Sequence, residues 1–103
     1  MSIFGDWDVS IKTPVGSLYI VYSFKERDGR ITGSAAGKSE TVPLTDIVLT
    51  DDTDGQRVSW RQTVTKPMRL KLEFDVVVDG DRLGGHSRAG RLPRSAVSGV
   101  RRA

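Results

Sequence analysis

The two halves of this chain repeat the same spacing of tryptophan, proline and turn residues. The run from Trp7 to Gly37 aligns with the run from Trp60 to Gly90, at an offset of 51 to 53 residues. Within this alignment Asp28-Gly29 matches Asp79-Gly80, and such pairs favour the tight turns of β-hairpins. A repeat of this length, built from alternating apolar and polar residues between turns, predicts an all-β domain made of two similar halves.

Alternation of apolar and polar residues predicts about eight short strands. We expect them at about residues 7–12, 18–25, 30–36, 42–49, 57–65, 68–78, 82–89 and 94–102. The fourth changes phase at Thr45-Asp46, which indicates a bulge or a bend. Strands joined mostly by tight turns favour a single antiparallel up-and-down barrel over residues 1–103, with a two-sheet sandwich as the alternative.

Composition limits the chemistry that the chain can perform. Its hydrophobic content of 37% suits a globular domain, and no apolar run approaches the ~20 residues of a membrane span. The N-terminal residues lack the basic and apolar regions of a signal peptide, so we expect a cytoplasmic protein. Without cysteine, and with His86 as its single histidine, the chain has neither thiolate chemistry nor a multi-histidine metal centre. No cofactor or metal site is predicted.

Charge is distributed unevenly along the chain. Up to residue 81 there are 10 basic and 13 acidic residues, whereas the rest contains six arginines and no acid. These arginines are Arg82, Arg88, Arg91, Arg94, Arg101 and Arg102. They indicate either an anion-binding face or solvated outward positions on the last two strands. Residues 82–103 contain no aromatic side chain on which bases could stack, which argues against nucleic acid.

Two short motifs are similar to those of known barrels. Gly5-Asp6-Trp7 resembles the Gly-x-Trp signature that opens the first strand of lipocalins and the wider calycin group, and the turn from Asp28 to Gly33 resembles one common in avidin-like proteins. The resemblance implies that Trp7 closes one barrel end and that Arg101 or Arg102 packs across its ring. It also implies ligand binding inside the barrel. The chain departs from these families in its short length and lack of a disulfide, and it carries no match to the biotin-contacting residues of avidins.

Inward positions of the predicted strands suggest a ligand site. Small residues on two equivalent strands face large ones, an arrangement that either fills the barrel or leaves an aromatic-lined hollow. The candidate ligand-binding residues are Trp7, Tyr22, Trp60, Gln62, Met68, Phe74 and Ser87. A buried Gln62 needs partners for both ends of its amide, from a neighbouring strand or from a ligand, whereas a position near the rim would let it reach water. We favour the position near the rim.

Three hypotheses for function follow. The first is a small intracellular barrel that binds an apolar or aromatic small molecule. The second is a cofactor-free cyclase, isomerase or lyase, which requires a tyrosine, His86 or Glu73 to point inward. Alternation places the last two outward, and Glu73 and Asp75 are expected to pair with basic residues across the strands. The third is a structural or interaction module that uses the C-terminal arginines.

Outward apolar residues suggest that the chain forms a homodimer. These are Tyr19, Val21 and Val77, which fall on the polar side of their strands. A sheet face of this kind is suited to a two-fold contact between copies, and such dimers are the commonest closed assembly.

Overall fold

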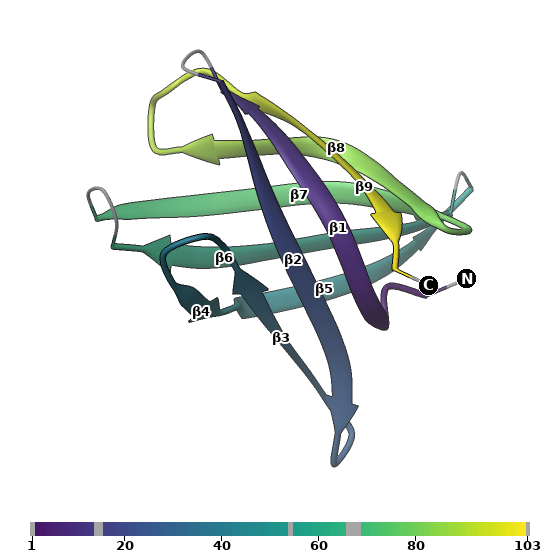
Figure 1. Ribbon diagram of the computed structural model, residues 1–103. Helices are drawn as coiled ribbons and strands as arrows, with labels where there is room; N and C mark the ends of the chain where they lie inside the picture. The colour runs from purple at the N-terminus through teal and green to yellow at the C-terminus, as the bar shows by residue number, and fades with distance from the viewer. Residues whose placement is uncertain (1, 14–15, 54, 66–68, 103) are drawn as a thin grey trace.

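The computed structural model describes residues 2–13, 16–53, 55–65 and 69–102, and these form strands and turns without a helix. The strands are β1 (Gly5–Thr13), β2 (Gly16–Arg27), β3 (Arg30–Ala36), β4 (Thr41–Pro43), β5 (Thr45–Asp52), β6 (Gly55–Val64), β7 (Leu70–Asp79), β8 (Arg82–Ala89) and β9 (Ser95–Arg101). They make one antiparallel sheet in the order β4-β3-β2-β1-β9-β8-β7-β6-β5. The sheet curls into a nearly closed up-and-down barrel (Figure 1), which confirms the predicted fold class.

The described strands number nine rather than about eight because the predicted fourth strand divides at its change of phase. Its register with β6 shifts between Thr45 and Val48, and Asp46 has a φ of 52°. Before this bulge, the Leu44 N–H donates to the Gly33 carbonyl of β3 at 2.9 Å. After it, β5 pairs with β6. One bent segment therefore connects the two ends of the sheet, as bulges do where barrels turn a corner.

The sequence repeat corresponds to two three-stranded meanders, β1–β3 and β6–β8. Trp7 lies opposite Tyr22 in the first meander, and Trp60 lies opposite Phe74 in the second. All four side chains are buried. The repeat therefore places equivalent aromatic pairs on the inner face of each half.

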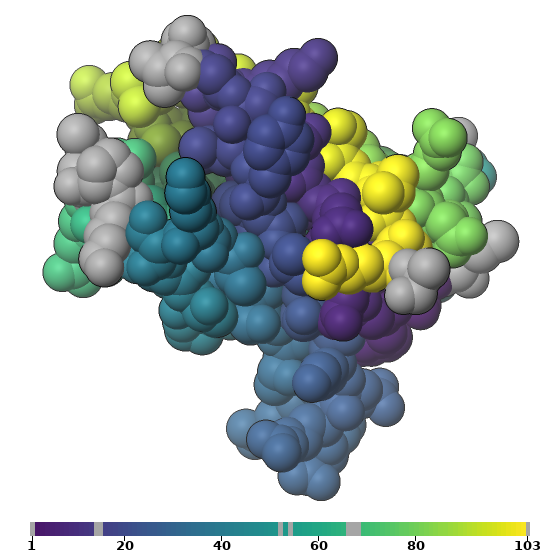
Figure 2. Space-filling view, viewed as in Figure 1, coloured from purple at the N-terminus to yellow at the C-terminus, as the bar shows by residue number. Residues whose placement is uncertain are grey.

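The barrel has two distinct ends. At the closed end lie the N-terminal segment Ser2–Phe4 and the turn at Gly80-Asp81, near both chain termini (Figure 1). At the open end, β1, β6 and β8 finish at Thr13, Val64 and Ala89. The hairpin of β2 and β3 projects from the body, as the space-filling view shows (Figure 2), and its residues 25–30 are exposed.

The core occupies the inside of the barrel, on the side of each strand that alternation predicted. Buried hydrophobic side chains include Ile3, Trp7, Val9, Ile11, Tyr22, Phe24, Ala35, Val42, Leu44, Val58, Trp60, Phe74, Val76, Val78, Leu83 and Val97. No helix in the described ranges is long and apolar enough to span a membrane.

Candidate ligand site inside the barrel

Trp7 and Arg101 seal the closed end. The Arg101 guanidinium carbon lies 4.3 Å from the centroid of the Trp7 ring, a distance at which cation–π attraction is effective. Its two terminal nitrogens donate to the Phe4 carbonyl at 2.6 Å and to the Ser2 carbonyl at 2.7 Å. This contact confirms the pairing that the resemblance implied and selects Arg101. Arg102 instead pairs with Asp8 at 3.1 Å.

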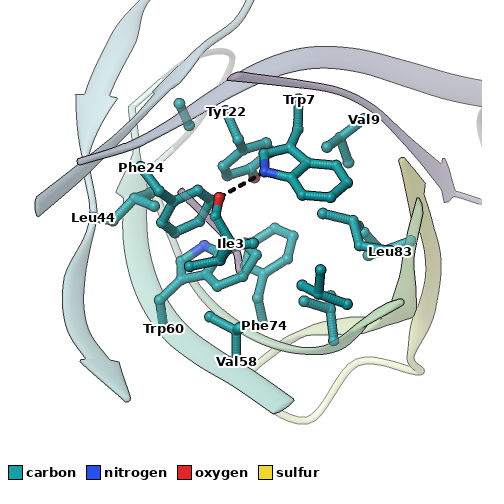
Figure 3. Close-up of a cluster of buried hydrophobic side chains, with 14 of the residues drawn as sticks. Ile3, Trp7, Val9, Tyr22, Phe24, Leu44, Val58, Trp60, Phe74 and Leu83 are labelled. Carbon is teal, nitrogen blue, oxygen red and sulfur yellow. Dashed lines mark hydrogen bonds between the residues drawn. The ribbon is translucent and has the colours of Figure 1, made fainter. Parts of the chain in front are cut away.

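Ile3 plugs the same end from inside. The Trp7 indole N–H donates to the Ile3 carbonyl at 2.7 Å, and the Ile3 side chain is fully buried. Figure 3 shows Ile3 in the middle of the labelled core side chains, with its carbonyl turned towards Trp7. A ligand that reached the interior would therefore enter from the open end.

Four aromatic rings pack against one another across the middle of the barrel. Trp60 stacks on Phe74 with centroids 5.0 Å apart and meets Phe24 edge-on at 5.2 Å. Tyr22 contacts Trp60 at 5.3 Å and Phe74 at 5.8 Å. These are the separations at which aromatic pairs attract, so the middle of the interior is filled by these side chains.

Gln62 connects two of these rings through hydrogen bonds. Its Oε1 accepts from the Tyr22 hydroxyl at 2.8 Å and from the Trp60 indole N–H at 3.1 Å. Because an indole N–H can only donate, it requires an acceptor, and this contact fixes which end of the amide faces Trp60. Tyr22, Trp60 and Gln62 are therefore held together as one polar cluster inside the barrel.

The other end of the Gln62 amide has no partner among the residues that the structure describes. The Gln62 side chain is only 2% exposed, so its Nε2 is shielded from water. This nitrogen nevertheless makes no hydrogen bond within the described part of the chain. The preferred expectation that the Gln62 side chain reaches water was therefore wrong. An unpaired buried donor of this kind costs about 1–3 kcal/mol.

Half-buried apolar side chains surround the open end. Leu18 is 52% exposed, although it lies on the inward side of β2 together with Ile20 and Tyr22. Leu70 and Leu72 of β7 are also only partly buried, and Leu72 lies opposite Gln62. The open end thus offers apolar surface beside the polar cluster, the composition usual for a small-molecule site.

Of the other four predicted ligand-binding residues, the three that the structure describes do not gather beside Gln62 at the open end. Phe74 belongs to the aromatic packing, while Ser87 is buried opposite Phe74 on β8. Trp7 belongs to the closed end. Met68 lies outside the described residues. Sequence reasoning missed Ile3 and Phe24, for which the apolar pair Ile3-Phe4 ahead of the Gly-x-Trp motif and the alternation of β2 were the available signals.

The interior provides little acid–base chemistry. Of the groups that the enzyme hypothesis required, Tyr22 points inward, whereas Glu73 and His86 line the outer face. Burial raises the pKa of the Tyr22 phenol strongly, and its hydrogen bond to Gln62 opposes this only in part. The phenol therefore stays protonated near neutral pH and acts as a hydrogen-bond donor. Within the described ranges no cluster of three or more metal-ligating side chains occurs.

The outward apolar residues do not share one face. Tyr19 is 76% exposed and lines a groove of about 330 Å³ together with Val21 and Val100. Val77 lies on β7, which β1, β9 and β8 separate from β2 in the sheet. The homodimer remains a prediction, with β1, β2 and β9 as the face concerned.

Comparison with known proteins adds no family to this description. No protein-family model, curated protein or solved structure matches the chain. The fold and the site therefore have to be interpreted from their own geometry.

Proposed function

We propose that this barrel binds an apolar or aromatic small molecule that carries a hydrogen-bond acceptor, and that the molecule enters through the open end. The observation that supports the proposal most is the buried Gln62 Nε2 beside Tyr22 and Trp60, which makes no hydrogen bond to any residue that the structure describes. A ligand carbonyl or ether oxygen at this nitrogen would supply the missing acceptor. The rest of the ligand would lie against the apolar side chains of the open end.

The surroundings of Gln62 favour such a ligand over a buried water molecule. A buried water typically needs two to four polar partners. Along β7 the neighbours of Gln62 are Leu70 and Leu72, which offer only apolar side chains. A molecule with one acceptor and an otherwise apolar surface suits one buried donor among apolar side chains better than water does, because it leaves none of its own polar groups unpaired.

Two probe molecules of similar shape test the proposal. Acetophenone carries a carbonyl oxygen, and ethylbenzene does not. Titration of the protein with each, followed by tryptophan fluorescence and by thermal unfolding, should show that acetophenone binds about tenfold more tightly, as expected for one hydrogen bond to a buried donor. In a Gln62→Met variant, which keeps the side-chain length but lacks the amide, this preference should disappear while ethylbenzene binding remains.

The controls separate the site from general hydrophobic binding. Leu92, which is 57% exposed on the loop after β8, can be replaced by Gln as a surface control that should leave both affinities unchanged. Equal affinity of the wild-type protein for the two probes would overturn the role of Gln62. Absence of binding by either probe would indicate a filled barrel without a small-molecule site.

A further inference from the structure

The outer face of the barrel carries a second concave feature, unrelated to the interior. A groove of about 560 Å³ runs across β5, β6, β7 and β8, the strands that pass behind β1 and β2 in Figure 1. Val48 and Ser59, which lie opposite each other in register, are among its lining residues. Because these two side chains are short and the charged ones around them are long, the sheet surface here is hollowed.

The acidic residues of the groove already have basic partners. Asp75 accepts two hydrogen bonds from Arg57, at 2.9 and 2.8 Å, and this contact lowers the pKa of its carboxyl group. Glu73 lies 3.5 Å from Arg61, which confirms the cross-strand pairing expected for it, and Asp46 lies 3.9 Å from the same arginine. Two arginines therefore contact the three carboxylates of this side of the groove, with Arg61 shared between Asp46 and Glu73.

On the other side of the groove, β8 and the loop that follows it contribute three more basic groups. His86 lies opposite Asp75 in register, Arg88 lies opposite Glu73, and Arg94 precedes β9. His86 and Arg94 act on Asp75 through space. Among the residues that the structure describes, neither Arg88 nor Arg94 is within hydrogen-bond or salt-bridge distance of a carboxylate, and both are exposed. The β8 side of the groove thus carries two guanidinium groups that lie near carboxylates but make no direct contact with one among the described residues.

We propose that this groove binds an anion, a carboxylate or a phosphate group of a small molecule, between Arg88 and Arg94. Guanidinium groups suit such anions because their donors match two acceptor oxygens at once. His86 lies beside them as a further donor. Of the six arginines after residue 81, Arg88 and Arg94 are the two that line this groove, whereas Arg101 holds the closed end and Arg102 pairs with Asp8.

Titration with sodium acetate and sodium phosphate, at constant ionic strength, tests this site. The measurement is the set of backbone ¹H–¹⁵N correlations of the labelled protein. We expect saturable shifts at Ser59, Asp75 and His86 with at least one of the two anions. A double variant Arg88→Gln with Arg94→Gln should bind that anion about tenfold more weakly, since each lost contact was charge-assisted.

A variant of equal charge gives the control. Arg27→Gln with Arg30→Gln removes the same charge from the projecting β2–β3 hairpin, away from the groove, and should leave the affinity unchanged. Saturation by acetate alone would assign a carboxylate ligand, and saturation by phosphate a phosphate ligand. The proposal is overturned if neither anion saturates these signals, or if both double variants weaken binding equally, because net charge would then explain the effect.

Discussion

Replacing Tyr22 by Phe should change how the stability of the protein depends on pH. The Tyr22 hydroxyl donates to Gln62 Oε1 at 2.8 Å inside the barrel. Removing it should lower the free energy of unfolding by about 1 kcal/mol at pH 7, the usual net value of a hydrogen bond. Trp60 still donates to the same oxygen, so the acceptor keeps one partner.

At high pH, the effect of the Tyr22→Phe substitution on the free energy of unfolding should reverse. Burial raises the pKa of Tyr22 above its ordinary value of 10.0, so the folded protein keeps a proton that the unfolded chain releases. Stability from this group is complete below pH 10 and falls as the pH rises above it, by about 1.4 kcal/mol at pH 11. The variant lacks this loss. Its free energy of unfolding should therefore meet that of the wild type between about pH 10 and 11.

Urea unfolding at pH 7, 9, 10 and 11 measures this crossing. All other titrating groups are common to both proteins, so their effects cancel in the difference. Tyr19→Phe is the matched control, because the Tyr19 ring is 76% exposed and its hydroxyl stays in water on folding. If the difference between wild type and Tyr22→Phe keeps one value across the whole range, the reasoning about Tyr22 burial is refuted.

Three further substitutions test other parts of the structure, each by urea unfolding. Gly85→Ala should cost about 1–3 kcal/mol, because its Cβ would overlap the Asp75 carbonyl oxygen, whereas Gly84→Ala, with its nearest atom at 3.9 Å, should be tolerated; equal effects would contradict the packing. Arg101→Gln should cost about 2–4 kcal/mol through the lost cation–π contact and carbonyl hydrogen bonds, and a loss below 0.5 would contradict its sealing role. Arg57→Gln should lower the free energy of unfolding by about 0.5–1 kcal/mol at pH 7, and this loss should vanish in acid. Arg57 lowers the pKa of Asp75 in the folded protein below its ordinary value of 3.8. The ion pair therefore stabilises the protein above pH 3.8, and this stabilisation is lost as the pH falls through the pKa of folded Asp75. A difference that persists near pH 2 would argue against that ion pair.

Much of the fold was predictable because one face of nearly every strand is buried. The alternation of β7, with Phe74, Val76 and Val78 inward, is a local pattern that survives folding unchanged. The change of phase at Thr45-Asp46 marked the bend that joins β4 to β5. Gly-x-Trp together with a terminal arginine predicted the closed end. The first two features depend on neighbouring residues, whereas the closed end was predicted from the family resemblance.

The site was less predictable because it depends on contacts between distant strands. Alternation placed Gln62 inward but could not tell how far it lies from the rim, since this depends on the register of β6 with β7. Whether the interior is filled depends on the three distances between the rings of Tyr22, Phe24 and Trp60, which alternation does not fix. The outer groove likewise depends on long-range pairing, because Ser59 on β6 and Arg88 on β8 come near each other only when both strands pair with β7.

The side-chain amide of Gln62 gives the most direct test of interior binding. Its ¹H–¹⁵N signals can be assigned by their loss in the Gln62→Met variant and then followed during titration with acetophenone. Our account predicts that both amide proton signals shift saturably, in step with the quenching of tryptophan fluorescence. Saturable acetophenone binding that leaves the Gln62 amide signals in place would contradict the account, since the ligand would then lie elsewhere on the barrel.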